Sequence, residues 1–338
     1  MFPHQHISLP SELFTCKTLI QLSLVSELVC DTLLSSVWLP NLKDLHVSLD
    51  YPGNDITQKL FSSCPVLENL YISANMESEE DIVFNVCSPA LKRLQFNLAA
   101  FFENGLVLTG NKIVVNAPVL EVLIVDDDYL ACYSLKNLSS LVSAYIDVGD
   151  RFIETIGMKE HANQIFMLLE GITNVKFLTL QTATMAVIKV LDFADDNKLP
   201  LFPNLIHLKL FVPNGYSWRR LPDLLVGAPN LATLVLSKNH ASEEEEEDDL
   251  VHEFCWVEPQ RTPTCLLSKL EELEVILFQG DDDELKLLKY FLENGKVLKE
   301  LLIYSCHLTF EEKWNFFEKV LQFRRASKTC RITYTDKN

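Results

Sequence analysis

One short phrase, L-x-x-L-x-φ in which φ is apolar, recurs along this 338-residue chain and limits what it can fold into. It reads LIQLSL from Leu19, LKDLHV from Leu42, LENLYI from Leu67, LKRLQF from Leu91, LEVLIV from Leu120, LVSAYI from Leu141, VKFLTL from Val175, LIHLKL from Leu205, LATLVL from Leu231, LEELEV from Leu270 and LKELLI from Leu298. The phrases recur at intervals of 21 to 39 residues, with a mean near 28. A repeat of this period indicates stacked units rather than one globular core.

The columns of the eleven phrases predict a strand with one buried and one exposed side. Positions one, four and six hold 33 residues, all of them apolar, whereas positions three and five hold 22, of which seven are apolar. A period of two places successive side chains on opposite faces of a strand. The alternative is a set of unrelated strands in an ordinary α/β domain, but the phrase recurs too often at similar spacing to favour it.

Proline stands two residues before six of the phrases, as Pro40, Pro65, Pro89, Pro118, Pro203 and Pro229. Proline ends a preceding helix and holds its neighbour extended, so each of these prolines marks the approach to a strand. The residue before the proline is often small or apolar, which predicts a side chain tucked inside the coil.

Several segments between the strands have helical patterns, at residues 54–64, 159–171, 217–230, 283–295 and 309–323. Thr309 followed by Glu312 resembles a capping box that opens the last of these helices. A final strand is expected at about Cys330 to Tyr334. The predicted fold class is therefore α/β: a leucine-rich-repeat solenoid with a curved parallel sheet on its concave side and helices and coil on its convex side.

The chain divides into three predicted segments. Residues 1–240 carry leucine-rich repeats, residues 241–253 form an acidic flexible insertion, and residues 254–338 continue the solenoid and cap it. The insertion contains seven consecutive acidic residues, Glu243 to Asp249, which repel one another. We interpret this run as a surface loop; a specific basic partner is the alternative.

A set of residues near the C-terminus carries a resemblance to a known family. The set is Trp256, Glu258, Pro259, Pro263, Cys265, Leu266, Leu270, Phe278, Gly280, Lys289, Tyr290, Leu292, Asn294, Val297, Leu298, Arg324, Ala326, Ser327 and Cys330. In residue type and order this stretch resembles the FBD domain of plant F-box/FBD/leucine-rich-repeat proteins, whose repeats the L-x-x-L-x-φ phrases also resemble. The resemblance implies a protein-binding module similar to the substrate-recognition part of a Skp–cullin–F-box ubiquitin ligase receptor.

One departure from that family concerns the start of the chain. The family carries an N-terminal F-box that docks on the ligase adaptor, whereas here the first repeat begins near Cys16. We expect the F-box to be missing, natively or by truncation, so that binding of the ligase adaptor is not expected. The alternatives are a non-degradative interaction scaffold or inhibitor that uses the same concave face, or a truncated product without function.

Charge and composition argue against several classes of partner. Lys and Arg total 29 and Asp and Glu total 47, a formal charge of −18, so neither nucleic acid nor a membrane is an expected partner. The start of the chain does not have the pattern of a secretory signal. Nine scattered cysteines without a C-x-x-C pair indicate free, mostly buried thiols in a reducing compartment, cytoplasmic or nuclear.

The sequence contains no motif for catalysis or for a cofactor. Phosphate-binding loops, nucleophile elbows and zinc helices are all missing, so we predict neither an enzyme nor a cofactor. His4 and His6 are too few to hold a metal. The triplets Asp126–Asp128 and Asp281–Asp283 have the ligand type for a hard cation, but solvated or helix-capping carboxylates are the simpler interpretation. No metal ligand is assigned.

The exposed side of the strands is the remaining candidate for function. Positions three and five line the concave face, on which solenoids commonly bind. The residues predicted to contact a protein substrate or partner are Asp44, His46, Asn69, Tyr71, Arg93, Gln95, Tyr145, Thr179, His207 and Lys209. Tyr71, Arg93 and Tyr145 are the expected anchors, because Tyr and Arg often dominate binding energy. A plain solvated sheet is the alternative for each.

Overall fold

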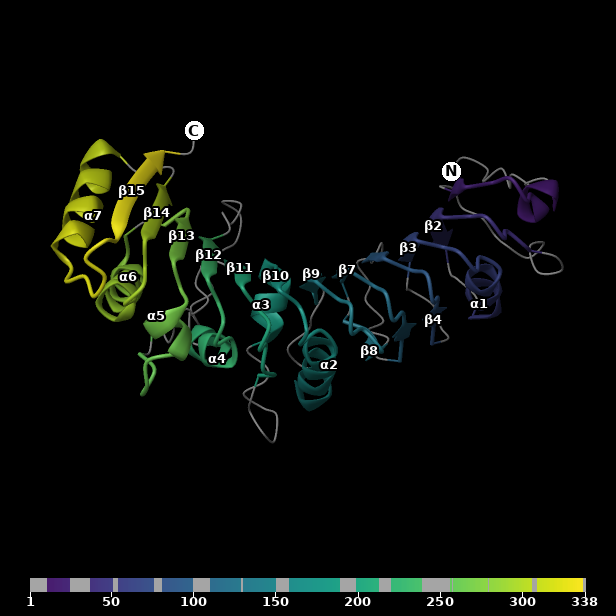
Figure 1. Ribbon diagram of the computed structural model, residues 1–338, viewed down its shortest axis with the longest axis horizontal. Helices are drawn as coiled ribbons and strands as arrows, with labels where there is room; N and C mark the ends of the chain where they lie inside the picture. The colour runs from purple at the N-terminus through teal and green to yellow at the C-terminus, as the bar shows by residue number, and fades with distance from the viewer. Residues whose placement is uncertain are drawn as a thin grey trace, which may run out of the picture. The chain divides into compact units, whose positions relative to one another are not determined.

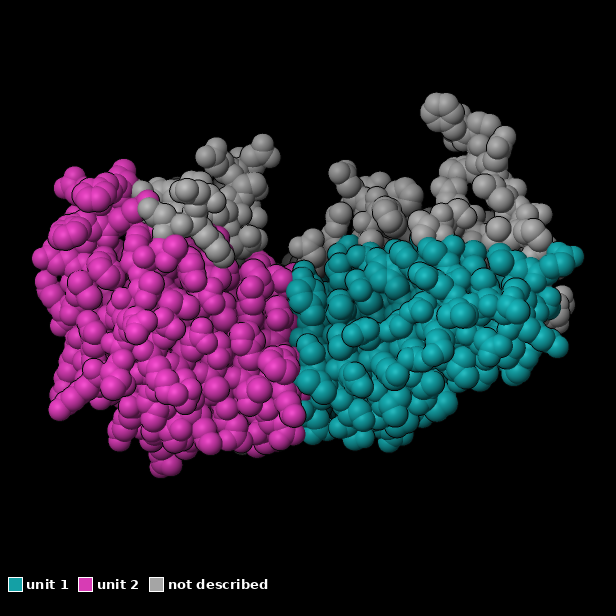
Figure 2. Space-filling model, turned by 45° about the horizontal axis from the view of Figure 1, so that its top comes forward, with its two compact units in different colours: residues 1–174 teal, residues 175–338 magenta. Residues whose placement is uncertain are grey.

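The structure is a computed structural model (Figure 1) that describes residues 11–24, 37–50, 54–75, 81–99, 110–128, 130–149, 158–188, 199–212, 220–238, 256, 258–278, 280–305 and 309–336. The chain divides into two compact units, residues 1–174 (unit 1) and 175–338 (unit 2), which Figure 2 shows in different colours. This boundary falls inside the predicted repeat segment 1–240. The predicted acidic insertion at 241–253, with the run Glu243 to Asp249, lies outside the described residues, as do His4 and His6.

The repeat phrases of unit 1 form one parallel sheet. Its strands, in spatial order, are β1 (Gln21–Leu24), β2 (Asp44–Asp50), β3 (Asn69–Asn75), β5 (Arg93–Ala99), β7 (Val122–Asp127) and β9 (Ser143–Val148). Each strand begins at position three of its phrase. The predicted strands and their common direction are therefore confirmed within this unit.

Register places equivalent apolar residues of successive repeats side by side. Position four stacks as Leu45, Leu70, Leu94, Leu123 and Ala144, and position six as Val47, Ile72, Phe96, Val125 and Ile146. Every one of these side chains is at most 2% exposed. Each repeat thus buries its apolar positions against its neighbours, which is how a solenoid is stabilised.

The prolines stand in tight turns that lead into the strands. The N–H of Leu67 donates to the carbonyl of Cys64 at 3.2 Å, and that of Leu231 to the carbonyl of Ala228 at 3.2 Å. Proline is then the second residue of a hydrogen-bonded four-residue turn, a position that suits its fixed φ. Cys64 is 1% exposed and Ala228 0%, so the tucked side chain before the proline is confirmed.

A second layer covers the buried side of the unit 1 sheet. It contains helix α1 (Asn54–Ser62), a three-stranded parallel sheet of β4 (Val83–Cys87), β6 (Lys112–Asn116) and β8 (Cys132–Lys136), and helix α2 (Met158–Gly171). A short 3₁₀ turn, Ser11–Thr15, precedes β1. Phe84 of β4 packs against Phe96 of β5 with ring centroids 6.1 Å apart, so the core lies between the layers. Both helices were predicted, whereas the small sheet was not.

The repeat phrases of unit 2 form a parallel sheet of the same kind. Its strands are β10 (Phe177–Leu180), β11 (His207–Val212), β12 (Thr233–Lys238), β13 (Glu272–Ile276), β14 (Glu300–Ser305) and β15 (Arg331–Asp336), in spatial order. The last of these is the strand expected at the end of the chain. The leucine-rich-repeat fold is thus present in both units.

Helices form the second layer of unit 2. They are α3 (Thr182–Ile188), α4 (Leu221–Gly227), α5 (Thr264–Ser268), α6 (Asp282–Asn294) and α7 (Phe310–Gln322). The capping box predicted at Thr309 and Glu312 is present at the start of α7. A second box opens α6, where the Asp281 side chain accepts from the N–H of Glu284 at 2.9 Å. Each satisfies backbone donors that a helix start would leave free.

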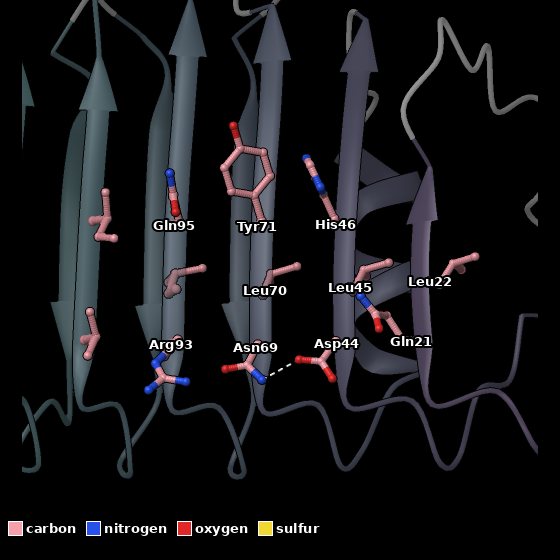
Figure 3. Close-up of a pocket in the computed structure, with 13 residues that line it drawn as sticks. Gln21, Leu22, Asp44, Leu45, His46, Asn69, Leu70, Tyr71, Arg93 and Gln95 are labelled. Carbon is pink, nitrogen blue, oxygen red and sulfur yellow. Dashed lines mark hydrogen bonds between the residues drawn. The ribbon is translucent and has the colours of Figure 1, made fainter.

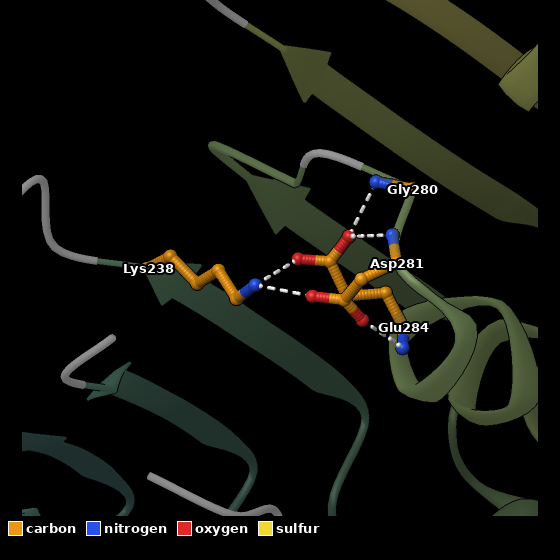
Figure 4. Close-up of polar contacts among 4 residues, drawn as sticks. All are labelled: Lys238, Gly280, Asp281 and Glu284. Atoms are coloured by element: carbon orange, nitrogen blue, oxygen red, sulfur yellow. Dashed lines mark hydrogen bonds and ion pairs between the residues drawn. The ribbon is translucent and has the colours of Figure 1, made fainter. Parts of the chain in front are cut away.

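A partly buried charge cluster joins the end of β12 to the start of α6 (Figure 4). The Lys238 ammonium donates to Asp281 at 2.8 Å and forms an ion pair with Glu284, whose side chain is 0% exposed. Burial raises the pKa of the Glu284 carboxyl, against the pull of Lys238. Burial also disfavours the Lys238 ammonium, but Glu284 and Asp281 hold its pKa above the ordinary value. The cluster ties neighbouring repeats together.

The residues that carry the C-terminal resemblance are mostly packing residues. The Trp256 and Tyr290 rings lie 5.4 Å apart, and burial raises the pKa of Tyr290 to about 12. The Asn294 amide donates to the Tyr290 carbonyl at 2.9 Å. Gly280 has a φ of +86°, and a Cβ there would lie 3.0 Å from the Phe316 ring. Only glycine fits this close approach without strain.

Candidate functional site

The exposed face of the unit 1 sheet contains a hollow of about 400 Å³ (Figure 3). It crosses β1, β2, β3, β5 and β7, and six of the ten predicted binding residues line it: Asp44, His46, Asn69, Tyr71, Arg93 and Gln95. The parallel register brings them together although Asp44 and Gln95 are far apart in the sequence. We call this feature the face hollow. Whether it contacts a partner stays a prediction.

Side chains of the face hollow stand in two rows across the strands. Position three contributes Gln21, Asp44, Asn69, Arg93 and Val122, and position five contributes His46, Tyr71, Gln95 and Ile124. Because strands lie about 4.8 Å apart, neighbours in a row are within reach of one another. The rows change from polar at β1 and β2 to apolar at β7.

A hydrogen bond orders the polar part of the hollow. The Asn69 amide donates to the Asp44 carboxylate, as Figure 3 shows. In the other row the rings of His46 and Tyr71 meet edge to face, with centroids 4.0 Å apart and an interplanar angle of 74°. His46 is exposed and Tyr71 is half-buried. The result is an amphipathic surface with one ordered hydrogen bond and one aromatic contact.

Arg93 supplies the cation of this face. Among the described face positions of the six unit 1 strands, it is the only Lys or Arg. It is exposed, and it stands between Asn69 and Val122 in its row. A guanidinium offers five donors in a planar fork, which suits a carboxylate. The half-buried Val122 and Ile124 beside β5 supply apolar contact area.

The remaining predicted residues do not line the hollow. Tyr145 stands beside Ile124, one strand further along. In unit 2, Thr179 and Lys209 are register partners, and the Lys209 ammonium lies 4.7 Å from the Phe211 ring centre. Burial lowers the pKa of His207, helped by Lys209 and opposed by Glu272 and Glu274. Gln21, Val122 and Ile124 were missed, although they occupy the same phrase columns as the residues we chose.

Members of both aspartate triplets accept hydrogen bonds from protein donors. Asp126 accepts from the Asn97 amide at 2.9 Å, and the buried Asp127 accepts from the Tyr133 hydroxyl at 2.7 Å and the Ala131 N–H at 2.8 Å. Asp281 caps α6. Over the described part of the chain, no group of three or more His, Cys, Asp or Glu side chains is placed to hold a metal ion. These carboxylates act as capping and hydrogen-bonding groups.

The described cysteines are free thiols, and three of them, Cys64, Cys265 and Cys330, are buried. Burial raises the pKa of Cys64 to about 12 and that of Cys265 to about 11. A thiol with such a pKa stays protonated at neutral pH and is a poor nucleophile.

None of the described helices is long and apolar enough to cross a bilayer.

Comparison with known proteins agrees with this architecture. A family model described as FBD matches residues 258–303, and one described as FBD-associated F-box protein At5g56370, LRR repeats, matches residues 2–144. Putative F-box/FBD/LRR-repeat protein At5g22670 of Arabidopsis thaliana is 31% identical over 334 residues, which are 96% of this chain and 71% of that protein. The chain belongs to the plant F-box/FBD/LRR-repeat family.

Other family members are equally similar. F-box/FBD/LRR-repeat protein At1g78750 of Arabidopsis thaliana is 30% identical, over 96% of this chain and 68% of that protein. F-box/LRR-repeat protein At3g59200 of the same plant is 31% identical, over 98% of this chain and 65% of that protein. The FBD match lies wholly within unit 2 and includes the packing residues Cys265, Gly280 and Tyr290.

Proposed function

We propose that this chain is the substrate-recognition part of an F-box/FBD/LRR ubiquitin-ligase receptor, and that the face hollow contacts the protein it recognises. The observation that carries the proposal is the convergence of a polar pair, an aromatic pair and a lone arginine in one hollow beside two apolar residues. Anchors of protein interfaces are commonly Tyr and Arg side chains set among contacts that exclude water.

A non-degradative scaffold or inhibitor that uses the same face is the second candidate. It would need the same contacts, because recognition depends on the hollow and not on what happens to the partner afterwards. A truncated product without function is the remaining possibility, and it predicts no specific partner at this face. The family relationship favours a protein partner over a small molecule, and no catalytic step is proposed.

Site-specific photocrosslinking tests the contact. A photoreactive phenylalanine analogue in place of Gln95 should crosslink one defined protein in plant cells. The same analogue at Lys112, an exposed position of the small outer sheet, serves as the control. Tyr71→Ala should weaken binding of that protein about thirtyfold, the size of a hot-spot loss near 2 kcal/mol. Equal crosslinking from both positions would contradict the proposal.

The fate of the crosslinked protein separates the two candidates. If the chain serves a ligase, the steady-state level of this protein falls when the chain is expressed together with the F-box of its own gene, and proteasome inhibition restores the level. If the chain is a scaffold or inhibitor, the level does not change, although the crosslink from Gln95 is still formed. Absence of any specific crosslink would favour the product without function.

A further inference from the structure

A second groove runs along the edge of unit 1 at which the strands begin. Its volume is about 870 Å³, and it is formed by residues just before β1, β2, β3, β5 and β7. We call it the edge groove. Its lining residues do not overlap with those of the face hollow. It needs a separate explanation.

Exposed apolar side chains lie in the edge groove. Ile20 is 58% exposed, Val66 38% and Val119 39%. A single exposed aliphatic residue is ordinary on a protein surface, whereas several in one groove indicate an interaction site. Pro89 and Ala90 precede β5, which lies between β3 and β7, and they continue the apolar lining between Val66 and Val119.

A comparison among the repeats shows that both valines, Val66 and Val119, stand where other repeats have a residue that makes a stabilising hydrogen bond. Directly after the turn proline, Asn41 donates to the Lys17 carbonyl at 2.6 Å, and Asn230 donates to the Pro203 carbonyl at 2.8 Å. Each bond ties a turn to the turn of the preceding repeat. Val66 and Val119 occupy the equivalent position and have no amide to donate. These repeats lack that bond and expose apolar surface at the groove instead.

The charges of the edge groove differ from those of the chain as a whole. Its lining contains Lys17, Lys43 and Lys92 but a single carboxylate, Glu68. Glu68 lies 2.8 Å from the Lys43 ammonium and 2.7 Å from that of Lys92, and both lysines stay about half exposed, at 54% and 49%. Glu121, which occupies the phrase position of Lys92 in the repeat that follows, lies outside the lining and reduces the positive excess without cancelling it. The chain carries a formal charge of −18, so this local excess favours an anionic ligand.

We propose that the edge groove binds an acidic peptide segment of a partner protein that also carries apolar side chains, in an extended conformation. The apolar residues of the segment would contact Ile20, Val66 and Val119, and its carboxylates would contact the three lysines. From β1 to β7 there are four strand spacings of about 4.8 Å, or about 19 Å, which an extended chain spans in about six residues. This proposal stands apart from the face hollow and its partner.

Fluorescence anisotropy with the full chain tests the proposal. The probe is a labelled eight-residue peptide of alternating Leu and Asp. It should bind, and raising the salt from roughly 50 mM to roughly 500 mM should weaken binding, because the lysines are exposed. A peptide with Lys in place of each Asp, and one with Ser in place of each Leu, should not bind. Equal binding of the Lys peptide would overturn the proposal.

A matched pair of variants locates the site. The double variant Val66→Asn, Val119→Asn introduces the residue that the fold uses at Asn41 and Asn230, so it should fold at least as stably as the unchanged chain. It should weaken binding of the Leu–Asp peptide about tenfold through the lost apolar contact. Leu201→Asn, which removes a 66% exposed leucine outside the edge groove, should change nothing. Unchanged affinity in the double variant would overturn the proposal.

A further variant distinguishes a partner from the chain itself. The seven acidic residues Glu243 to Asp249 are replaced by alternating Ser and Gly. If a partner segment is the ligand, this change should leave the affinity for the Leu–Asp peptide within about twofold at roughly 500 mM salt, where long-range repulsion is screened. A peptide that binds only after the replacement would identify the chain's own acidic run as the occupant and contradict the proposal.

Discussion

Units 1 and 2 have the same buried strand side but different layers on top of it. In unit 1 the layer includes the three-stranded sheet β4-β6-β8, whereas in unit 2 helices α3 to α7 follow the strands. The strand positions four and six are buried in both. The comparison shows that the phrase L-x-x-L-x-φ determines the strand and its buried side, and leaves the return segment free to be strand or helix.

The exposed faces of the two units also differ. In unit 1, positions three and five include amides, a His–Tyr pair and one arginine. In unit 2, the rows include Lys209 beside Phe211 and the carboxylates Glu272 and Glu274. The buried positions are apolar in both units, so the repeats of one family can differ in binding through the residues at these exposed positions.

The largest expected effect comes from the shared buried side. Leu123→Ala in β7 and Leu234→Ala in β12 both remove a 0% exposed leucine at position four. Each should lower the free energy of unfolding by about 3 kcal/mol, the usual cost of a leucine-sized cavity in a core. Urea unfolding followed by circular dichroism measures both. If only one of the two variants lowered the free energy of unfolding by less than about 1 kcal/mol, β7 and β12 would not be equivalent at this buried position.

A smaller effect should be confined to unit 2. Glu284→Gln keeps an oxygen for the capping box of α6 but removes the buried negative charge beside Lys238. We expect a loss of about 2 kcal/mol, because Lys238 is left with Asp281 alone. Adding Lys238→Met should recover part of the loss, since the unbalanced charge is then gone. The same urea titration measures both, and no recovery in the double variant would show that the ion pair is not the cause.

The smallest effect belongs to the edge of unit 1. Lys43 and Lys92 lower the pKa of Glu68 from 4.5 to about 2. Because the folded pKa is depressed, the stabilisation is present above about pH 5 and is lost as the pH falls toward 2. Glu68→Gln should therefore reduce stability slightly at about pH 6 and not at about pH 2. The difference in urea midpoint between variant and parent tests this. A difference that grows on acidification would contradict the assignment.

Helices were easier to predict than the outer strands. Residues 159–171 and 283–295 have apolar residues at helical spacing over three turns or more, and both segments are helices. The strands β4, β6 and β8 are five residues each. So short an apolar alternation is common in loops, and only its pairing with two similar segments makes it a sheet.

The sequence was enough to name several residues of the face hollow but not the contacts between them, and the reason is physical. The period-two alternation identifies the residues on the exposed side of each strand, so Asp44, His46 and Tyr71 could be named from the sequence. The Asn69–Asp44 hydrogen bond and the His46–Tyr71 contact depend on register between strands about 25 residues apart. Register is a property of the stacked chain, which no single repeat contains.

The sequence by itself determined the repeat strands, their buried columns, the prolines that mark the approach to the strands and the FBD resemblance, because each follows from local spacing and residue type. Tertiary structure decided which residues become neighbours across repeats: the face hollow, the edge groove and the Lys238–Glu284 cluster. Hydrogen bonds and ion pairs act over about 3 Å, a distance fixed only when the strands stack in register.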